Sequence, residues 1–146
     1  MAIRQITIIG TGLVGGSFGL ALKKRRFKGR IVGCDREAVL RLAQKRGAID
    51  EGKTNPLEAV RGSQIILLAT PVGAIIELIE RLEPALTPRT LLTDVGSTKA
   101  EVLSRAKKTF GNNTRTRFLA GHPWPAKSIL AWNLLNQIFS KVLPGW

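Results

Sequence analysis

Three glycines near the start of the chain, Gly10, Gly12 and Gly15, have the spacing G-x-G-x-x-G. Between a strand and a helix, this spacing is typical of turns that bind the pyrophosphate of a dinucleotide. Gly10 permits a sharp turn, Gly12 lets the backbone approach the phosphates, and Gly15 lets the helix lie close to the strand. Backbone N–H groups at the helix N-terminus then face the phosphates, and the helix dipole favours their charge. The residues predicted to bind the cofactor here are Gly10, Thr11, Gly12, Leu13, Val14 and Gly15.

The residues around this turn are of the types that the site requires. Four β-forming residues, Ile6–Ile9, lead directly into Gly10, and a helical pattern runs from Leu13 to the basic cluster Lys23–Arg26. A glycine-rich turn that binds no ligand has the same spacing. The position directly after a strand of buried type favours the dinucleotide site over that alternative.

An acidic residue follows the second predicted strand, Arg30–Asp35. Asp35 lies 20 residues after Gly15, where an acid can accept hydrogen bonds from the adenosine ribose hydroxyls. Asp35 also suits the N-cap of the predicted helix Glu37–Arg46, and the two roles are compatible. Arg36 either stacks on the adenine or meets a 2′-phosphate. The acid favours NAD as the cofactor, and Arg36 keeps NADP as the alternative.

A near-continuous apolar run, Gln64–Thr70, is typical of a central parallel strand covered on both faces. The loop at its carboxyl end is expected to pass near the cofactor, because open α/β sheets bind ligands beyond the carboxyl ends of their strands. The residues predicted to bind the cofactor in this loop are Ala69, Thr70 and Pro71.

Two polar residues follow the last two predicted strands, Thr90–Val95 and Arg117–Ala120: they are Ser97 and His122. His122 is the only histidine, and its ordinary pKa near neutrality suits it to accept a proton from a substrate hydroxyl. Ser97 would orient His122 or touch the substrate, and Lys99 would attract a carboxylate. The alternatives are a surface Gly-His-Pro turn and a serine that caps the following helix.

Predicted strands and helices alternate along the whole chain, which indicates an α/β, doubly wound, Rossmann-type single domain with a mostly parallel sheet. The other predicted elements are the strand Ala48–Asp50 and the helices Pro56–Val60, Ala74–Leu86 and Ala100–Phe110.

The composition of the 146 residues is that of an ordinary globular protein, with 44% hydrophobic and 23% charged residues. No secretion signal or run long enough to span a membrane is evident, and the only cysteine, Cys34, fits a cytoplasmic protein. The net charge is +13, but the basic residues are scattered and follow no nucleic-acid-binding motif. We therefore expect neither nucleic-acid nor membrane nor metal binding, and assign the charge to solvated surface and to attraction of an anionic cofactor and substrate.

Six motifs between residues 6 and 123 together resemble the prephenate/arogenate dehydrogenases of tyrosine biosynthesis: G-T-G-L-V-G-G-S followed by A-L-K, G-C-D-R, G-A-I-D-E-G, A-T-P-V, D-V-G-S-T-K and G-H-P. The resemblance implies that the glycine-rich turn and the acid bind NAD or NADP. It implies that His122 takes the proton from the ring hydroxyl of the substrate, while a hydride passes to the nicotinamide and carbon dioxide leaves. Ser97 would lie beside His122. Such enzymes also have an all-helical second domain, which forms the dimer and much of the substrate pocket.

The resemblance stops after Pro123. We divide the chain into a dinucleotide-binding domain, 1–123, and an aberrant apolar tail, 124–146, with the helical domain absent. The loss of one adenine from the coding DNA, just before the codon of Trp124, would explain the tail. Restoring that base shifts the reading frame, and the shifted frame can encode a sequence like the family's own continuation. The hypothesis is therefore an out-of-frame tail, which the coding DNA tests. Its three tryptophans would pack on the domain or form a homodimer contact.

The sequence thus predicts the cofactor domain of an oxidoreductase that decarboxylates prephenate or arogenate. This chain is expected to bind the dinucleotide but to be weakly active or inactive. One alternative is a non-enzymatic nucleotide-binding or interaction module. Another is a dehydrogenase with a related first domain, of the β-hydroxyacid or pyrroline-carboxylate type, although D-V-G-S-T-K and G-H-P argue against it.

Overall fold

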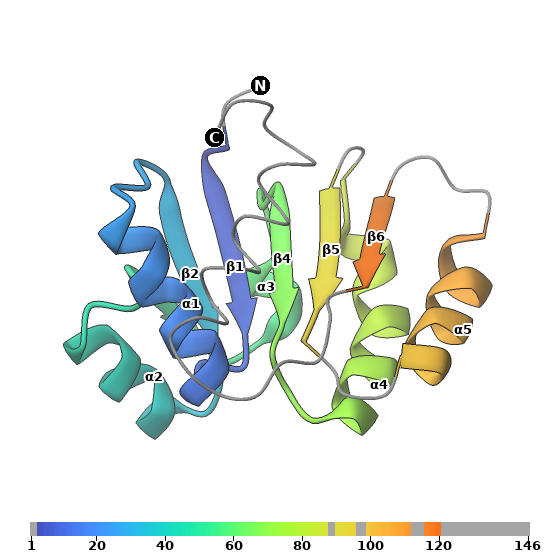
Figure 1. The fold of residues 1–146 in the computed structure, drawn as a ribbon, viewed down its shortest axis with the longest axis horizontal. Coiled ribbons are helices and arrows are strands. Elements are labelled where there is room, and N and C mark those ends of the chain that lie inside the picture. The colour runs from blue at the N-terminus through green and yellow to red at the C-terminus, as the bar shows by residue number, and fades with distance from the viewer. Residues whose placement is uncertain (1–2, 88–89, 96–98, 112–115, 121–146) are drawn as a thin grey trace.

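The computed structural model describes residues 3–87, 90–95, 99–111 and 116–120 (Figure 1), and strands and helices alternate through them. The strands are β1 (Gln5–Ile9), β2 (Arg30–Cys34), β3 (Glu51–Lys53), β4 (Ile65–Leu68), β5 (Thr90–Asp94) and β6 (Thr116–Ala120). The helices are α1 (Leu13–Lys24), α2 (Glu37–Lys45), α3 (Pro56–Ala59), α4 (Val72–Leu82) and α5 (Lys99–Phe110), and a 3-10 turn, η1 (Glu83–Ala85), follows α4.

The strands form one sheet in the order β3-β2-β1-β4-β5-β6, and every pair within it is parallel. From β1 the chain moves outward to β2 and β3, and then returns to place β4 on the other side of β1. The order therefore reverses between β1 and β4, where doubly wound sheets bind their ligands. The predicted Rossmann-type fold is confirmed.

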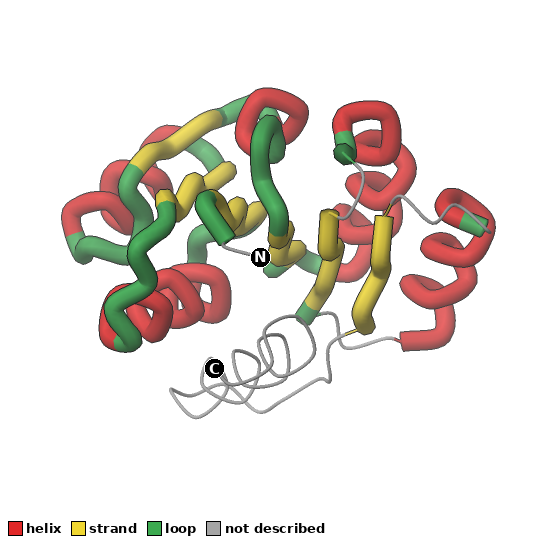
Figure 2. Tube along the Cα trace, turned by 90° about the horizontal axis from the view of Figure 1, so that it is seen from above, coloured by secondary structure: helices red, strands yellow, loops and turns green. Residues whose placement is uncertain are grey.

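Apolar side chains on both faces of the sheet form the core. On one face, residues of β1 pack with Phe18 and Leu22 of α1 and with Leu40 of α2. On the other, residues of β4 pack with Ile79 of α4 and Val102 of α5. Seen from above, helices lie on both sides of the strands (Figure 2). Because the sheet is covered on both faces, its central strand β4 (Ile-Ile-Leu-Leu) is apolar without alternation.

Two glycines allow α1 to approach its neighbours closely. A Cβ atom on Gly15 would lie 1.8 Å from the carbonyl oxygen of Gly10, and one on Gly19 would lie 2.2 Å from that of Ala48. Both distances are far shorter than van der Waals contact. Gly15 therefore has the packing role that the motif assigns to it. Gly19 has a similar packing role, although it is not part of the motif.

Two predicted elements differ from the structure by three residues or more at one end. The predicted strand Ala48–Asp50 is wrong, because the third strand is Glu51–Lys53. Ala48 and Ile49 are buried against the core instead. Asp50 brings the chain into the sheet: its N–H donates to the carbonyl of Ile31, and its carboxylate accepts from the N–H of Ile31.

The predicted helix Ala74–Leu86 starts two residues earlier, at Val72, and its α-helical part ends at Leu82. The 3-10 turn that follows contains Pro84, which has no N–H to continue the α-helical hydrogen bonds. Among the residues that the structure describes, no helix is long and apolar enough to cross a membrane.

Candidate cofactor-binding site

The glycine-rich turn leaves β1 at the carboxyl edge of the sheet. Gly10 has a φ of +92°, in the region that favours glycine, and its N–H donates to the carbonyl of Cys34 at 2.8 Å. A Cβ atom on Gly10 would lie 2.5 Å from the carbonyl oxygen of Ala69. The turn is therefore held between the ends of β2 and β4, and a residue with a side chain does not fit at its start.

The next glycine of the motif faces open space. Gly12 is the N-cap of α1, and nothing lies within 4 Å of the position of a Cβ atom there. No side chain caps the helix, and its first turn contains no acidic residue. The N-terminal N–H groups and the positive end of the helix dipole therefore lack a side-chain partner at this opening, as an anion-binding turn requires.

Asp35 is hydrogen-bonded to the same turn. Its Oδ2 accepts from the backbone N–H of Thr11 at 2.8 Å, and its Oδ1 accepts from that of Arg36 at 2.7 Å. The carboxylate thus lies at the carboxyl end of β2, beside the glycines. The alternative that Asp35 caps α2 is wrong, because Arg36 is the N-cap and no side chain caps that helix. The Arg36 side chain is exposed.

The loop after β4 places a polar atom without a partner at the same edge. The N–H of Ala69 donates to the carbonyl of Ile9 at 2.7 Å, and Pro71 is the N-cap of α4. Between them, the Oγ1 of Thr70 is buried and has no hydrogen-bond partner among the residues that the structure describes. Since a buried hydroxyl without a partner is costly, a ligand that hydrogen-bonds to Thr70 would remove this cost. Together with the open turn at Gly12, this hydroxyl fits a dinucleotide.

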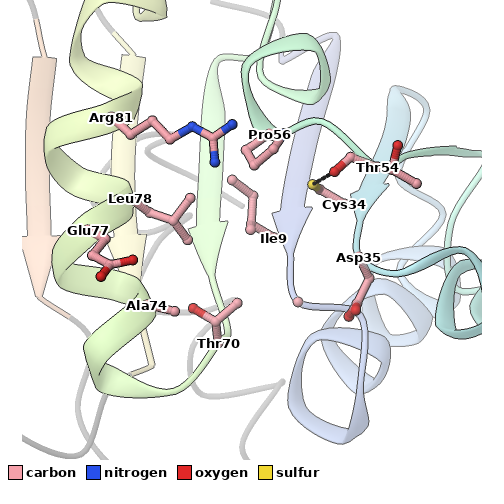
Figure 3. A pocket seen from close by; sticks show the side chains of 11 residues that line it. Ile9, Cys34, Asp35, Thr54, Pro56, Thr70, Ala74, Glu77, Leu78 and Arg81 are labelled. Carbon is pink, nitrogen blue, oxygen red and sulfur yellow. Dashed lines mark hydrogen bonds between the residues drawn. The ribbon is translucent and has the colours of Figure 1, made fainter.

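A cleft of about 300 Å³ is bordered by Gly10, Asp35 and Thr70 (Figure 3). It lies between the ends of β1 and β2 on one side and α4 on the other, so it coincides with the point where the strand order reverses. The residues that line it are Ile9, Gly10, Cys34, Asp35, Thr54, Pro56, Thr70, Ala74, Glu77, Leu78 and Arg81.

Cys34 forms part of the cleft wall as a buried thiol whose S–H donates to the carbonyl of Thr54. Burial raises the pKa of Cys34 to about 11; the charge of Asp35 adds to this rise and the charge of Arg81 opposes it. The thiol is therefore protonated at neutral pH and acts as an apolar wall rather than a nucleophile. The described residues contain no cluster of His, Cys, Asp or Glu that could hold a metal ion.

The motif-based prediction missed the wall that α4 contributes to this cleft. Ala74, Glu77, Leu78 and Arg81 recur at intervals of three and four residues, which is the spacing of one helical face. Because α4 starts directly after the carboxyl end of β4, that spacing was a signal that this face borders the site.

The predicted catalytic residues Ser97 and His122 lie outside the described residues, as does the tail 124–146 with its expected dimer contact. Of Lys99, the structure describes only that it begins α5. In the sequence, Ser97 and His122 follow β5 and β6, which are neighbours with Asp94 beside Ala120. The prediction that they act together stays a prediction.

The comparisons with known proteins give a consistent result. Residues 18–126 match the family model described as "Prephenate dehydrogenase, nucleotide-binding domain". A prephenate dehydrogenase of Lactococcus lactis subsp. cremoris (strain MG1363) is 41% identical over 125 residues, which are 83% of this chain and 34% of that protein. The chain thus spans about a third of the length of the curated relatives it matches.

Two solved structures are also similar, each with 30% sequence identity. The prephenate dehydrogenase of Aquifex aeolicus, in complex with hydroxyphenyl propionate and NAD+, matches with a TM-score of 0.74 over 84% of this chain and 42% of that chain. The arogenate dehydrogenase of Synechocystis matches with a TM-score of 0.71 over 82% of this chain and 41% of that chain.

Proposed function

Because this chain belongs to the prephenate dehydrogenase family and matches its nucleotide-binding domain, we propose that it binds NAD across the carboxyl edge of its sheet. The observation that carries the proposal is the pair of groups left for a ligand at that edge. These are the N-terminus of α1 at Gly12 and the buried hydroxyl of Thr70, neither of which has a side-chain partner in the described part of the chain. The NAD+ in the related Aquifex structure supports the choice of cofactor.

We assign the contacts along the edge as follows. The turn from Gly10 to Gly15 holds the pyrophosphate through the backbone N–H groups from Gly12 onward, because those of Gly10 and Thr11 already donate to Cys34 and Asp35. The Asp35 carboxylate accepts hydrogen bonds from the adenosine ribose. The loop of Ala69, Thr70 and Pro71 borders the other side of the cofactor. When bound, the nicotinamide ring supplies the hydride acceptor of the oxidation.

Asp35 favours NAD over NADP. Its negative charge would face the additional 2′-phosphate of NADP, and repulsion in a partly buried site is only weakly screened. The exposed guanidinium of Arg36 is the group that would accommodate the 2′-phosphate in the alternative, in which NADP binds.

The reaction that we propose for the family site is the oxidative decarboxylation of prephenate or arogenate. His122 would accept the proton of the ring hydroxyl, Ser97 would orient His122 or contact the substrate, and Lys99 would attract a substrate carboxylate. The part of such enzymes that this chain matches is the nucleotide-binding domain. We therefore expect the 146 residues alone to bind cofactor and to turn over prephenate weakly or not at all.

Titration calorimetry with NAD and NADP tests the cofactor proposal. The wild-type chain should prefer NAD. The substitution Asp35→Asn keeps an oxygen that can accept from Thr11 but removes the charge. It should weaken NAD binding about tenfold, the effect of one lost charge-assisted hydrogen bond, and should reduce the preference over NADP. A wild-type chain that binds neither dinucleotide would refute the proposed function.

A further inference from the structure

The cleft continues beyond the residues that the glycine motif and the acid predict. Moving away from Asp35, it passes over Ile9 toward α4 and the start of α3, where Leu78, Pro56 and Arg81 line it. In Figure 3, the Arg81 guanidinium reaches from α4 toward Pro56, at the opposite end of the cleft from Asp35. This end combines an apolar wall with one cationic group.

Arg81 has no ion pair with any described residue. Arg30, Arg41 and Arg105 each pair with a glutamate, whereas Arg81 does not pair even with Glu77, one turn earlier on the same helix. The charge of Arg81 nevertheless acts on the cleft wall, because it lowers the pKa of the Cys34 thiol and so opposes the effect of burial. The Arg81 side chain is exposed and lines the cleft, so its guanidinium is accessible to a ligand there.

A flat aromatic ring is the ligand group that suits this end of the cleft. A guanidinium stacks on aromatic faces better than an ammonium does, and apolar side chains such as Ile9 and Leu78 suit the other ring surface. The 2′-phosphate of NADP is a poorer candidate for Arg81. It would branch from the ribose, and we place the ribose at Asp35, at the other end of the cleft.

We infer that Arg81 of α4 contacts the purine base of the bound nucleotide and contributes to the affinity for adenosine. This inference rests on the proposed binding of NAD and extends it to a residue outside the glycine motif, the acid and the loop after β4. Arg81 is thus a binding residue that recognises the base, whereas the phosphates are held at the glycine-rich turn, Gly10 to Gly15.

The test compares ligands with and without phosphate on the full chain. Dissociation constants of adenosine, 5′-AMP and NAD are measured for wild type, Arg81→Gln, Arg81→Lys and the control Arg41→Gln. Arg81→Gln should weaken all three ligands by a similar factor, about 3- to 30-fold, which corresponds to one cation–π contact. Arg81→Lys should lose part of this affinity because it keeps the charge but not the planar group.

The control variant removes the same charge from an exposed residue of α2 whose partner is Glu37, so it should change the three constants less than twofold. If Arg81→Gln weakens 5′-AMP and NAD but not adenosine, Arg81 binds phosphate and the inference is wrong. Unchanged constants in Arg81→Gln would also overturn it. A wild-type chain that binds adenosine but not NAD would instead overturn the proposed function, and melting curves confirm that each variant is folded.

Discussion

Substituting alanine for each of two glycines of the same motif should give opposite results. In Gly15→Ala, the new methyl carbon would lie 1.8 Å from the carbonyl oxygen of Gly10 and 2.9 Å from Cγ2 of Ile8. The two backbone segments must therefore separate by roughly 1.6 Å before ordinary contact, which begins near 3.4 Å, is restored. That movement lifts α1, together with Phe18 and Leu22, away from the sheet.

The magnitude follows from two opposing effects. Overpacking against backbone costs about 3–4 kcal/mol, at the upper end of measured cases, while replacing a helical glycine by alanine returns about 1 kcal/mol. We expect Gly15→Ala to lower the free energy of unfolding by about 2–3 kcal/mol, which lowers the melting temperature by about 6–10 °C. In Gly12→Ala the methyl group meets nothing within 4 Å, so stability should change by less than about 1 kcal/mol.

The two variants should differ in NAD binding in a way that their stabilities do not predict. Gly12→Ala places a methyl group where the pyrophosphate must approach and should weaken NAD binding more than about tenfold in a folded protein. Thermal melts by circular dichroism and titration calorimetry measure the two properties. Gly73→Ala, in α4 and with open space around it, is the matched control and should leave both unchanged or raise stability slightly. A Gly15→Ala chain that melts within 2 °C of wild type, roughly the shift produced by 0.5 kcal/mol, would refute the packing argument.

Three further substitutions test other features. Thr70→Val should weaken NAD binding about 3- to 10-fold by calorimetry, without loss of thermal stability, because the Oγ1 has no partner within the described part of the chain. Arg26→Gly should raise the free energy of unfolding, measured in urea, by about 0.5–1 kcal/mol. Arg26 has a φ of +61°, and the backbone strain that glycine relieves there exceeds the entropy cost of glycine. Arg46→Gly is the control and should lower the free energy of unfolding, because Arg46 has an unstrained φ of −77°. Burial would raise the pKa of Asp50, but the hydrogen bonds from Lys23 and the N–H of Ile31, with the charges of Lys23 and Arg30, lower it below the ordinary value of 3.8. The stabilisation by the ionised Asp50 carboxylate is therefore present above pH 3.8 and is lost as the pH falls through the lowered pKa. The difference in free energy of unfolding between wild type and Asp50→Asn should consequently shrink in acid. A difference that does not depend on pH would contradict this assignment.

The sequence by itself determined the fold class and the glycine-rich turn between the first strand and the first helix. Both are local: the G-x-G-x-x-G spacing, the apolar run before it and the alternation of strands with helices all lie in short stretches of chain. The resemblance added the family, which the match over residues 18–126 shows. Short-range patterns predict such features because each depends on neighbours within one turn or one strand.

Only the tertiary structure decided what borders that turn. Asp35 bonds to Thr11 rather than capping α2, the third strand starts at Glu51 rather than Ala48, and Arg81 reaches the cleft from α4. Each depends on contacts between residues far apart in the sequence. The deciding feature is the position of β4 beside β1, which brings Thr70 and α4 to the glycine-rich turn. No single stretch encodes that neighbour relation, because it arises when the whole sheet buries its two faces.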